Sequence, residues 1–201
     1  MHGWGFSSKL LKNTPSIELP FHGKSPLEYK DMWGLAREIA PRIEKGSTLI
    51  GWSLGGSLAL MMAYLFKDRF KALVLVGTSP CFACFWPSKN LRGFTLRLER
   101  ERENFLREFR RLAYPKPFED TINLEGAKAL LKDYMKLDIR PILPYISQRV
   151  IILQGTEDPI VPFSSAITLH NMLKRAKLIT FLGGHFPKDE SFIFEVLKSL
   201  Q

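Results

Sequence analysis

A serine in a glycine-rich stretch is the residue whose setting most clearly suggests chemistry. Ser53 lies in the run Gly51-Trp52-Ser53-Leu54-Gly55-Gly56, which fits the pattern G-x-S-x-G. An apolar segment typical of a buried strand, Ser47–Ile50, precedes it, and an apolar helix is predicted over Leu54–Phe66. A serine between strand and helix stands on a strained turn, where small neighbours avoid a clash. We predict that Ser53 is a nucleophile and that the N–H of Leu54 faces the oxyanion; a glycine-rich turn in the core is the alternative.

A serine nucleophile needs a general base, and we assign this role to His185. It lies in a glycine-containing loop directly after a predicted strand, Lys177–Leu182. Such a loop places it at the sheet edge where Ser53 is expected, because ligands bind at the carboxyl ends of parallel strands. His170 falls inside a predicted helix, and His22 falls in a turn, where a structural role is expected.

The base needs an acid that fixes its tautomer, and we favour Asp158. It follows the predicted strand that ends at Gln154, and Pro159 stiffens the turn behind it. Glu157 is the nearest rival, and Asp189 is a weaker one. The three predicted catalytic residues occur along the chain in the order serine, aspartate, histidine.

A short motif at the start of the chain, His2-Gly3-Trp4-Gly5, is the candidate second half of an oxyanion hole. Such a dipeptide of histidine and glycine commonly donates a backbone N–H to the developing oxyanion. With the predicted catalytic residues, it indicates that the N–H groups of Trp4 and Leu54 act together.

Strands alternate with helices along the rest of the chain, which predicts an α/β fold with a mostly parallel sheet. The further strands are expected at Ser16–Leu19, Lys71–Val76 and Arg149–Gln154, and the further helices at Pro26–Lys45, Phe163–Lys174 and Lys188–Leu200. Residues 79–145 interrupt this alternation with a long, arginine-rich helical pattern. We interpret that segment as a lid inserted into a core formed by residues 1–78 and 146–201.

The amino-acid composition is that of a globular protein with a strongly positive net charge. Hydrophobic residues make up 45% of the 201 residues, as in ordinary globular proteins, and the formal net charge is +9. The positive charge suits an acidic partner; no nucleic-acid motif accompanies it. Glycines and serines interrupt the uncharged stretch Leu49–Phe66, so no membrane span is expected. Cys81 and Cys84 are expected to be reduced thiols in a cytoplasmic protein, although a redox pair or half a metal site is an alternative.

These motifs together resemble those of the pimeloyl-[acyl-carrier protein] methyl ester esterases, the α/β-hydrolases of the biotin pathway. The resemblance covers most of the chain and is weak within the lid. It rests on the stretches His2–Gly5, Leu19-Pro20 with Gly23–Ser25, Gly51–Gly56, Ser79–Phe82, Leu137–Pro141, Gly155–Pro162 and Gly184-His185. The strands that precede the first of these motifs in the family are missing from the sequence. We therefore expect an exposed sheet edge beside Ser47–Ile50 or Ser16–Leu19.

The resemblance implies a serine carboxylesterase that frees methanol from a pimeloyl methyl ester on acyl-carrier protein, without metal or organic cofactor. The implied substrate-binding residues are Trp4, Ser53, Leu54, Phe105, Phe109 and His185; lid packing is an equal alternative for Phe109. A general short-chain carboxylesterase or thioesterase, and a non-catalytic carrier-protein binder, are the alternative functions.

The lid also carries a local excess of positive charge. Nine basic residues and four acidic residues lie between Ser88 and Lys116. Acyl-carrier proteins are strongly acidic, so we expect Arg107, Arg110 and Arg111 to contact such a partner; an exposed helix with internal ion pairs is the alternative.

Overall fold

Four parallel strands form one sheet in the computed structural model, which describes residues 1–11 and 14–198. The strands are β1 (Thr48–Trp52), β2 (Ala72–Val76), β3 (Arg149–Gly155) and β4 (Ala176–Phe181), and they lie side by side in that order. Every residue of β2 is buried, because a central parallel strand is covered on both faces. The α/β fold is confirmed, and all of the described strand pairs are parallel.

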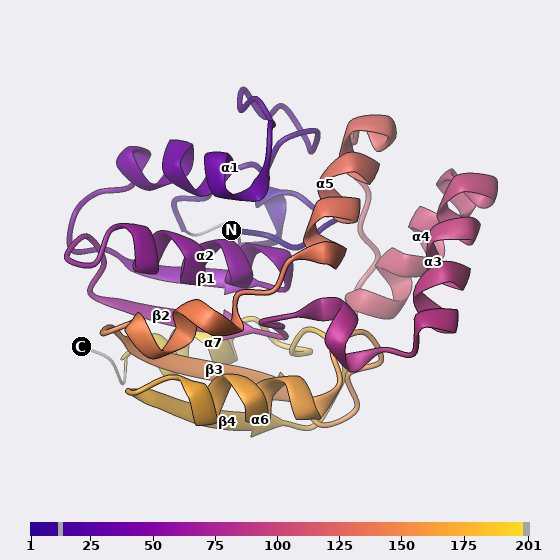
Figure 1. Ribbon diagram of the computed structural model, residues 1–201. Coiled ribbons are helices and arrows are strands. Elements are labelled where there is room, and N and C mark those ends of the chain that lie inside the picture. Colours follow the sequence, from indigo (N-terminus) through magenta and orange to yellow (C-terminus); the bar gives the residue numbers. More distant parts are fainter. Residues whose placement is uncertain (12–13, 199–201) are drawn as a thin grey trace.

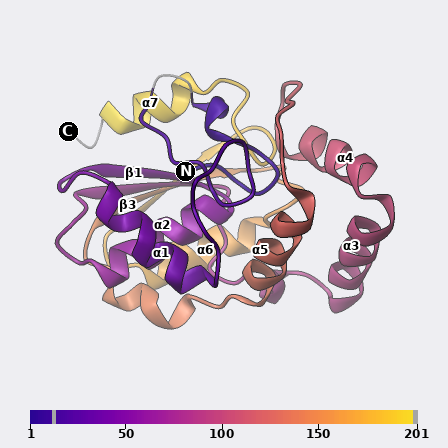
Figure 2. The ribbon, with the colours of Figure 1, turned by 90° about the horizontal axis from the view of Figure 1, so that it is seen from above.

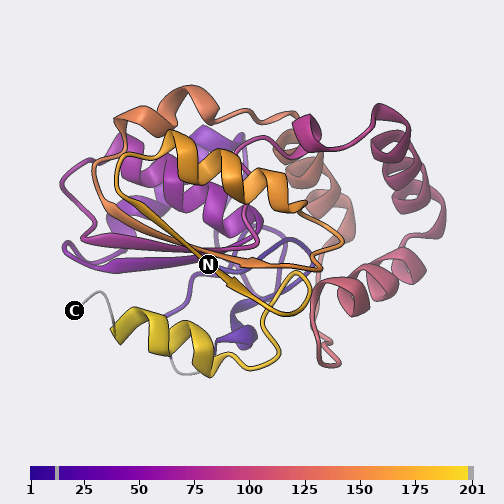
Figure 3. The same ribbon diagram turned by 90° about the horizontal axis from the view of Figure 1, so that it is seen from below.

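Helices cover both faces of the sheet. On one face lie α1 (Met32–Ile39), α2 (Leu54–Leu65) and α6 (Phe163–Met172), and on the other lies α7 (Ser191–Lys198) (Figures 1 and 3). Ten of the twelve residues of α2 are buried, since the sheet, α1 and the short helix η4 (Arg140–Tyr145) pack around it. This burial explains why α2 is apolar on all sides.

The segment between β2 and β3 is helical, as predicted, and stands at the carboxyl ends of the strands (Figures 1 and 2). It comprises a 3₁₀ turn, η3 (Phe82–Phe85), and the helices α3 (Ser88–Glu101), α4 (Glu103–Ala113) and α5 (Leu124–Lys136). Arg102, whose φ is 44°, separates α3 from α4 and ends the helical conformation between them. The sheet edge beneath this segment is the edge at which ligands bind in α/β folds.

Two sequence predictions near the N-terminus were wrong. Residues Ser16–Leu19 form no strand, because neighbouring side chains occupy their polar groups: Glu18 accepts hydrogen bonds from Ser8, and the N–H of Leu19 donates to His2. The helix predicted from Pro26 starts only at Met32, after Asp31 caps it by accepting from the N–H of Gly34.

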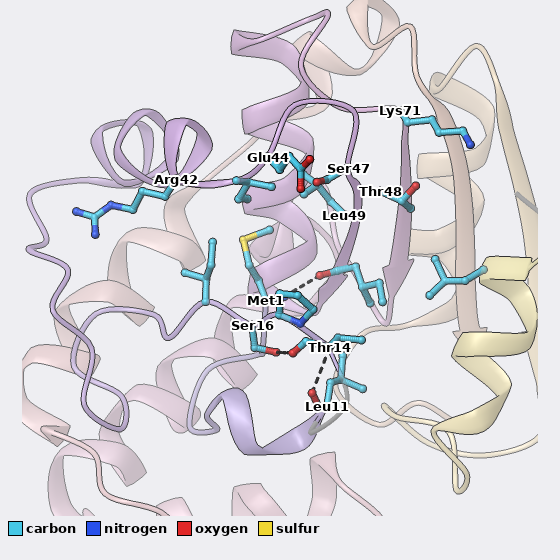
Figure 4. A pocket seen from close by; sticks show the side chains of 15 residues that line it. Met1, Leu11, Thr14, Ser16, Arg42, Glu44, Ser47, Thr48, Leu49 and Lys71 are labelled. Carbon is cyan, nitrogen blue, oxygen red and sulfur yellow. Dashed lines mark hydrogen bonds between the residues drawn. The ribbon is translucent and has the colours of Figure 1, made fainter. Parts of the chain in front are cut away.

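β1 is an edge strand, as expected from the sequence. Met1 pairs with its outer side, where the amine donates to Ile50 O at 2.7 Å and Trp52 N–H donates to Met1 O at 3.1 Å. Burial lowers the pKa of this amine to about 6. A groove of about 650 Å³ runs along the rest of the edge, lined by Thr48, Leu49 and residues 14–17 (Figure 4).

Two further expectations concern membranes and thiols. Within the described residues, no helix is long and apolar enough to cross a membrane. The expectation of reduced thiols was wrong: Cys81 and Cys84 form a disulfide, because the turn of η3 brings their Cα atoms to 5.4 Å from each other.

Candidate active site

Ser53 occupies the sharp turn between β1 and α2 in a backbone conformation that side-chain-bearing residues rarely adopt. Its φ is 54° and its ψ is −121°. Backbone hydrogen bonds hold it there, since Ser53 N–H donates to Val76 O at 2.8 Å and Gly56 N–H donates to Ser53 O at 2.9 Å. A Cβ on Gly51 would lie 2.5 Å from Gly55 O. The glycines of the motif are therefore required for the backbone to turn this tightly.

The predicted base and acid contact each other at the same edge of the sheet. His185 Nδ1 lies 2.8 Å from Asp158 Oδ2, and both side chains are about 1% exposed. The N–H groups of Ile160 and Val161 donate to Asp158 Oδ1 at 2.8 and 2.9 Å, and the Gln154 amide donates to Oδ2. Burial alone would raise the pKa of Asp158, but His185 and the N–H groups of Val161 and Ile160 lower it below its usual value. The carboxyl group is therefore suited to stay ionised beside the imidazole.

The two alternative candidates for the acid, Glu157 and Asp189, have different surroundings from Asp158. Glu157 is exposed, and Asp189 is exposed and accepts a hydrogen bond from the N–H of Ser191. Of the three candidate acids, only Asp158 has a hydrogen bond to His185 among the described residues.

The imidazole of His185 is held on several sides. A Cβ on Gly77, whose φ is 50°, would lie 2.8 Å from His185 Nδ1, so only glycine leaves room for the ring. The Trp52 indole N–H donates to His185 O at 3.0 Å. Nε2 of His185 is buried and has no hydrogen-bond partner in the described part of the chain. Because Nδ1 donates to Asp158, Nε2 is the nitrogen with a free lone pair.

The His2–Gly5 motif forms a loop against the nucleophile. A Cβ on Gly3 would lie 3.2 Å from Ser53 Cβ. His2 Nδ1 bonds Gly3 O at 2.9 Å, and its Nε2 accepts from Leu19 N–H at 3.0 Å. The indole N–H of Trp4 donates to Ala127 O at 2.7 Å, which joins the loop to α5. The predicted proximity of this motif to Ser53 is therefore present in the structure.

The other end of the loop is fixed by two side chains that sequence reasoning did not assign to the site. Gly5 N–H donates to His22 Nε2 at 3.0 Å, and Arg110 Nε donates to Gly5 O at 2.6 Å. His22 Nδ1 bonds Pro20 O at 2.7 Å, which fixes the neutral tautomer. Burial lowers the pKa of His22 to about 3. The expected structural role of His22 is thus to position Gly5.

Arg110 therefore does not fit the partner-binding role that we predicted for it. Its side chain is buried and also donates to Asp120 O at 3.1 Å. The helical spacing could have indicated that Arg110 is buried, since it shares one face of α4 with Leu106 and Ala113. Arg107 and Arg111 are exposed, as partner contacts must be.

Part of the positive charge of the lid is paired within the chain. Arg97 bonds Glu101 and Glu108, and Arg102 bonds Glu125. Neither Arg107 nor Arg111 has an ion pair among the described residues, so their charges remain available at the surface.

The two lid phenylalanines have different surroundings. Phe109 lies edge-on to Trp4 at 5.3 Å between ring centroids and lines an apolar pocket of about 170 Å³ with residues that include Phe82 and Ile160. Phe105 is buried beside Phe109, at 6.4 Å, and does not line that pocket. Phe109 therefore borders this pocket, and Phe105 packs behind it.

Comparison with known proteins identifies the family and the fold. The sequence model described as "Alpha/beta hydrolase family" matches residues 1–189. The chain belongs to the alpha/beta hydrolase family. The strand, turn and helix around Ser53, and the aspartate and histidine that follow, are consistent with this family's arrangement of site residues.

Several curated relatives carry the name that the sequence motifs suggested. A pimeloyl-[acyl-carrier protein] methyl ester esterase of Wigglesworthia glossinidia brevipalpis is 28% identical over 193 residues, which cover 81% of this chain and 74% of that protein. The protein of that name from Nitrosomonas europaea is 28% identical over 222 residues and covers 93% and 87%. This chain is therefore similar to esterases of that name over most of its length.

Solved structures confirm the fold. A hydrolase from Oleispira antarctica superposes with a TM-score of 0.83 at 16% identity, covering 98% of this chain and 88% of its own. An esterase from Exiguobacterium antarcticum gives a TM-score of 0.71 at 20% identity, covering 91% and 76%.

The buried neutral His22 predicts a specific pH dependence of stability. Because its folded pKa, about 3, is below the ordinary 6.5, the unfolded chain takes up the proton first as pH falls. The free energy of unfolding should therefore decrease by roughly 2 kcal/mol between pH 7 and pH 5 through this residue alone. Denaturant unfolding of wild type and His22→Gln at both pH values measures it, since glutamine does not titrate.

His170→Gln is the matched control, because His170 is exposed on α6. It should keep the wild-type pH dependence. If His22→Gln kept that dependence too, His22 would not be the buried neutral group described above.

Proposed function

We propose that this carboxylic ester hydrolase cleaves the methyl ester of a pimeloyl group carried on acyl-carrier protein, with Ser53, His185 and Asp158 as its catalytic triad. The observation that carries the proposal is the buried Asp158–His185 pair at the sheet edge where the strained turn presents Ser53. That combination supplies a nucleophile, a base with a free lone pair on Nε2, and a carboxylate that fixes the tautomer.

The reaction proceeds in two halves. Nε2 of His185 takes the proton of Ser53 as Oγ attacks the ester carbonyl carbon, and the carbonyl electron pair moves onto oxygen. The N–H groups of Leu54 and Trp4 stabilise that oxyanion. The C–O bond to the methoxy group then breaks, and His185 returns its proton so that methanol leaves. Water, deprotonated by His185, attacks the acyl-serine and releases the free carboxylic acid with Ser53 restored.

The substrate assignment rests on the named relatives and on two features of the lid. The relatives act, by name, on a pimeloyl methyl ester attached to acyl-carrier protein. The pocket that Phe109 lines is apolar, which suits a methylene chain. The exposed Arg107 and Arg111 supply positive charge for an acidic carrier. A general short-chain carboxylesterase would need the triad but neither of these features.

Substitutions at the triad test the mechanism. Ser53→Ala and His185→Ala should each remove ester hydrolysis by several orders of magnitude. Asp158→Asn should lower kcat by about 10⁴-fold, because asparagine favours the wrong imidazole tautomer. Glu157→Gln is the matched control and should retain wild-type activity, since Glu157 is exposed. Steady-state hydrolysis of a small methyl ester gives all four values; a defect in Glu157→Gln with full activity in Asp158→Asn would contradict the assignment of the acid.

Charge reversal on the lid tests the carrier-protein substrate. The double variant Arg107→Glu/Arg111→Glu should raise KM for a pimeloyl methyl ester on acyl-carrier protein, while hydrolysis of a small neutral methyl ester changes little. Added salt should also raise KM in wild type, because screening shortens the Debye length to about 8 Å at physiological ionic strength.

The double variant Arg37→Glu/Lys174→Glu provides a control with the same change in net charge. Arg37 lies on α1 and Lys174 follows α6; both residues are exposed, and neither belongs to the lid. This control variant should leave KM for the carrier substrate near the wild-type value. Equal losses on carrier and small substrates in the lid variant would contradict docking and favour a general esterase.

A further inference from the structure

Tyr134 has a buried hydroxyl for which the fold provides no partner. The residue lies on α5 and is 4% exposed, and its phenol oxygen makes no hydrogen bond with any described residue. Its ring packs near Phe82, at 5.7 Å between centroids. Most buried polar groups in proteins are hydrogen-bonded, so an unpartnered one needs an explanation, such as a ligand that completes it.

The helix α5, which carries Tyr134, is tied to the loop beside Ser53. One face of α5 is buried at Ala127, Leu130, Leu131 and Tyr134, which recur at helical spacing. The Trp4 indole bonds Ala127 O, so the face that carries Tyr134 is tied to the loop beside Ser53.

The polar side chains that act on the phenol are those of Ser57 and Ser53. Burial raises the pKa of Tyr134 to about 12, although the side chains of Ser57 and Ser53 lie close enough to lower it. Neither pair meets hydrogen-bond geometry, and the Ser57 hydroxyl donates to Ser79 O at 2.8 Å. The phenol therefore keeps its proton at neutral pH and remains a hydrogen-bond donor.

A second unpartnered atom belongs to His185, whose ring lies 5.5 Å from that of Trp52, the residue before Ser53, and it accepts rather than donates. Nε2 of His185 is buried, lacks a partner in the described part of the chain, and is an acceptor because Nδ1 faces Asp158. Nε2 can accept the proton of Ser53. The phenol can donate a hydrogen bond to an oxygen atom, and in ester hydrolysis the carbonyl oxygen is the one that gains negative charge.

We propose that Tyr134 is a third catalytic donor to the oxyanion, in addition to the N–H groups of Leu54 and Trp4. This inference deepens the proposed ester hydrolysis and rests on it. As the Ser53 Oγ–carbon bond forms, the carbonyl π electrons move to oxygen and the serine proton moves to His185 Nε2. Tyr134 donates a hydrogen bond to that oxygen and keeps its own proton throughout. When the tetrahedral intermediate collapses, the hydrogen bond weakens and the leaving alcohol takes its proton from His185.

Tyr134→Phe tests the proposal, because it retains the ring against Phe82 and removes only the hydroxyl. We expect kcat to fall by about 10²–10³-fold, as for the loss of one oxyanion donor, with KM little changed. The melting temperature should be equal to or above that of wild type, since an unsatisfied buried hydroxyl has been removed. Affinity for an alkyl trifluoromethyl ketone, which forms an oxyanion on Ser53, should fall in parallel with kcat/KM.

Two esters of one acyl chain, a methyl and a p-nitrophenyl ester, distinguish the site of donation. An oxyanion donor predicts a similar fold-loss for both in single-turnover acylation. A loss confined to the methyl ester would identify donation to the leaving oxygen and overturn the proposal. A lower melting temperature that accounts for the lost activity would also overturn it, as would unchanged activity.

Tyr114→Phe is the matched control, because Tyr114 is half-buried and packs on Phe118 and Phe186. It should keep activity within about twofold. Wild type and Ser53→Ala are measured on the same esters. If wild type is active, Ser53→Ala is inactive and Tyr134→Phe is unaffected, only the role of Tyr134 fails; if Ser53→Ala remains active, the proposed mechanism itself fails.

Discussion

The strained turn at Ser53 is the constraint on which the rest of the site depends. A residue with a side chain at positive φ costs of order 1–3 kcal/mol, so the surrounding structure must hold it. Hydrogen bonds from Ser53 N–H to Val76 O and from Gly56 N–H to Ser53 O supply part of that hold. The close approach at Gly51 supplies the space. In return, the turn places Ser53 at the N-terminus of α2, where the first backbone N–H groups of a helix lack intrahelical partners.

The second requirement concerns the loop His2–Gly5, which lies against Ser53 and must be as rigid as the turn. The carbonyl of Gly3 and both the N–H and the carbonyl of Gly5 are bonded to buried side chains, so the backbone around Trp4 cannot easily rotate. His2 is adjacent to Gly3 in the sequence, whereas His22 and Arg110 are 17 and 105 residues away from Gly5. Oxyanion donors are effective because they are oriented before the charge develops. In this chain Arg110 of α4 bonds the carbonyl of Gly5, so α4 helps to hold the loop that we propose to contain an oxyanion donor.

Much of the fold and of the candidate site follows from local patterns in the sequence. Continuous apolar runs predict β1, β2 and β3, and the G-x-S-x-G pattern places Ser53 between a strand and a helix. Asp158 and His185 were predictable because each follows a strand of the same parallel sheet, and such strands end at one edge.

What could not be predicted depends on contacts between distant segments. The pairing of Arg110 with Gly5 spans 105 residues and replaces the surface role that its charge suggested. Ser16–Leu19 has strand-like residues, but its polar groups are bonded to side chains from the start of the chain. The unpartnered hydroxyl of Tyr134 is likewise a property of the packed lid, since a tyrosine on an apolar helix face has no distinguishing sequence pattern.

Covalent labelling of the serine tests the central claim most directly. A fluorophosphonate reacts with a serine only when a base activates it and an oxyanion site accepts the phosphoryl oxygen. Intact-mass and peptide mass spectrometry of the full chain should show one adduct, on Ser53, whose formation parallels the loss of ester hydrolysis. An adduct on a different serine, or full inactivation with Ser53 unmodified, would contradict the account, as would an unlabelled Ser53 in a folded chain that still hydrolyses esters.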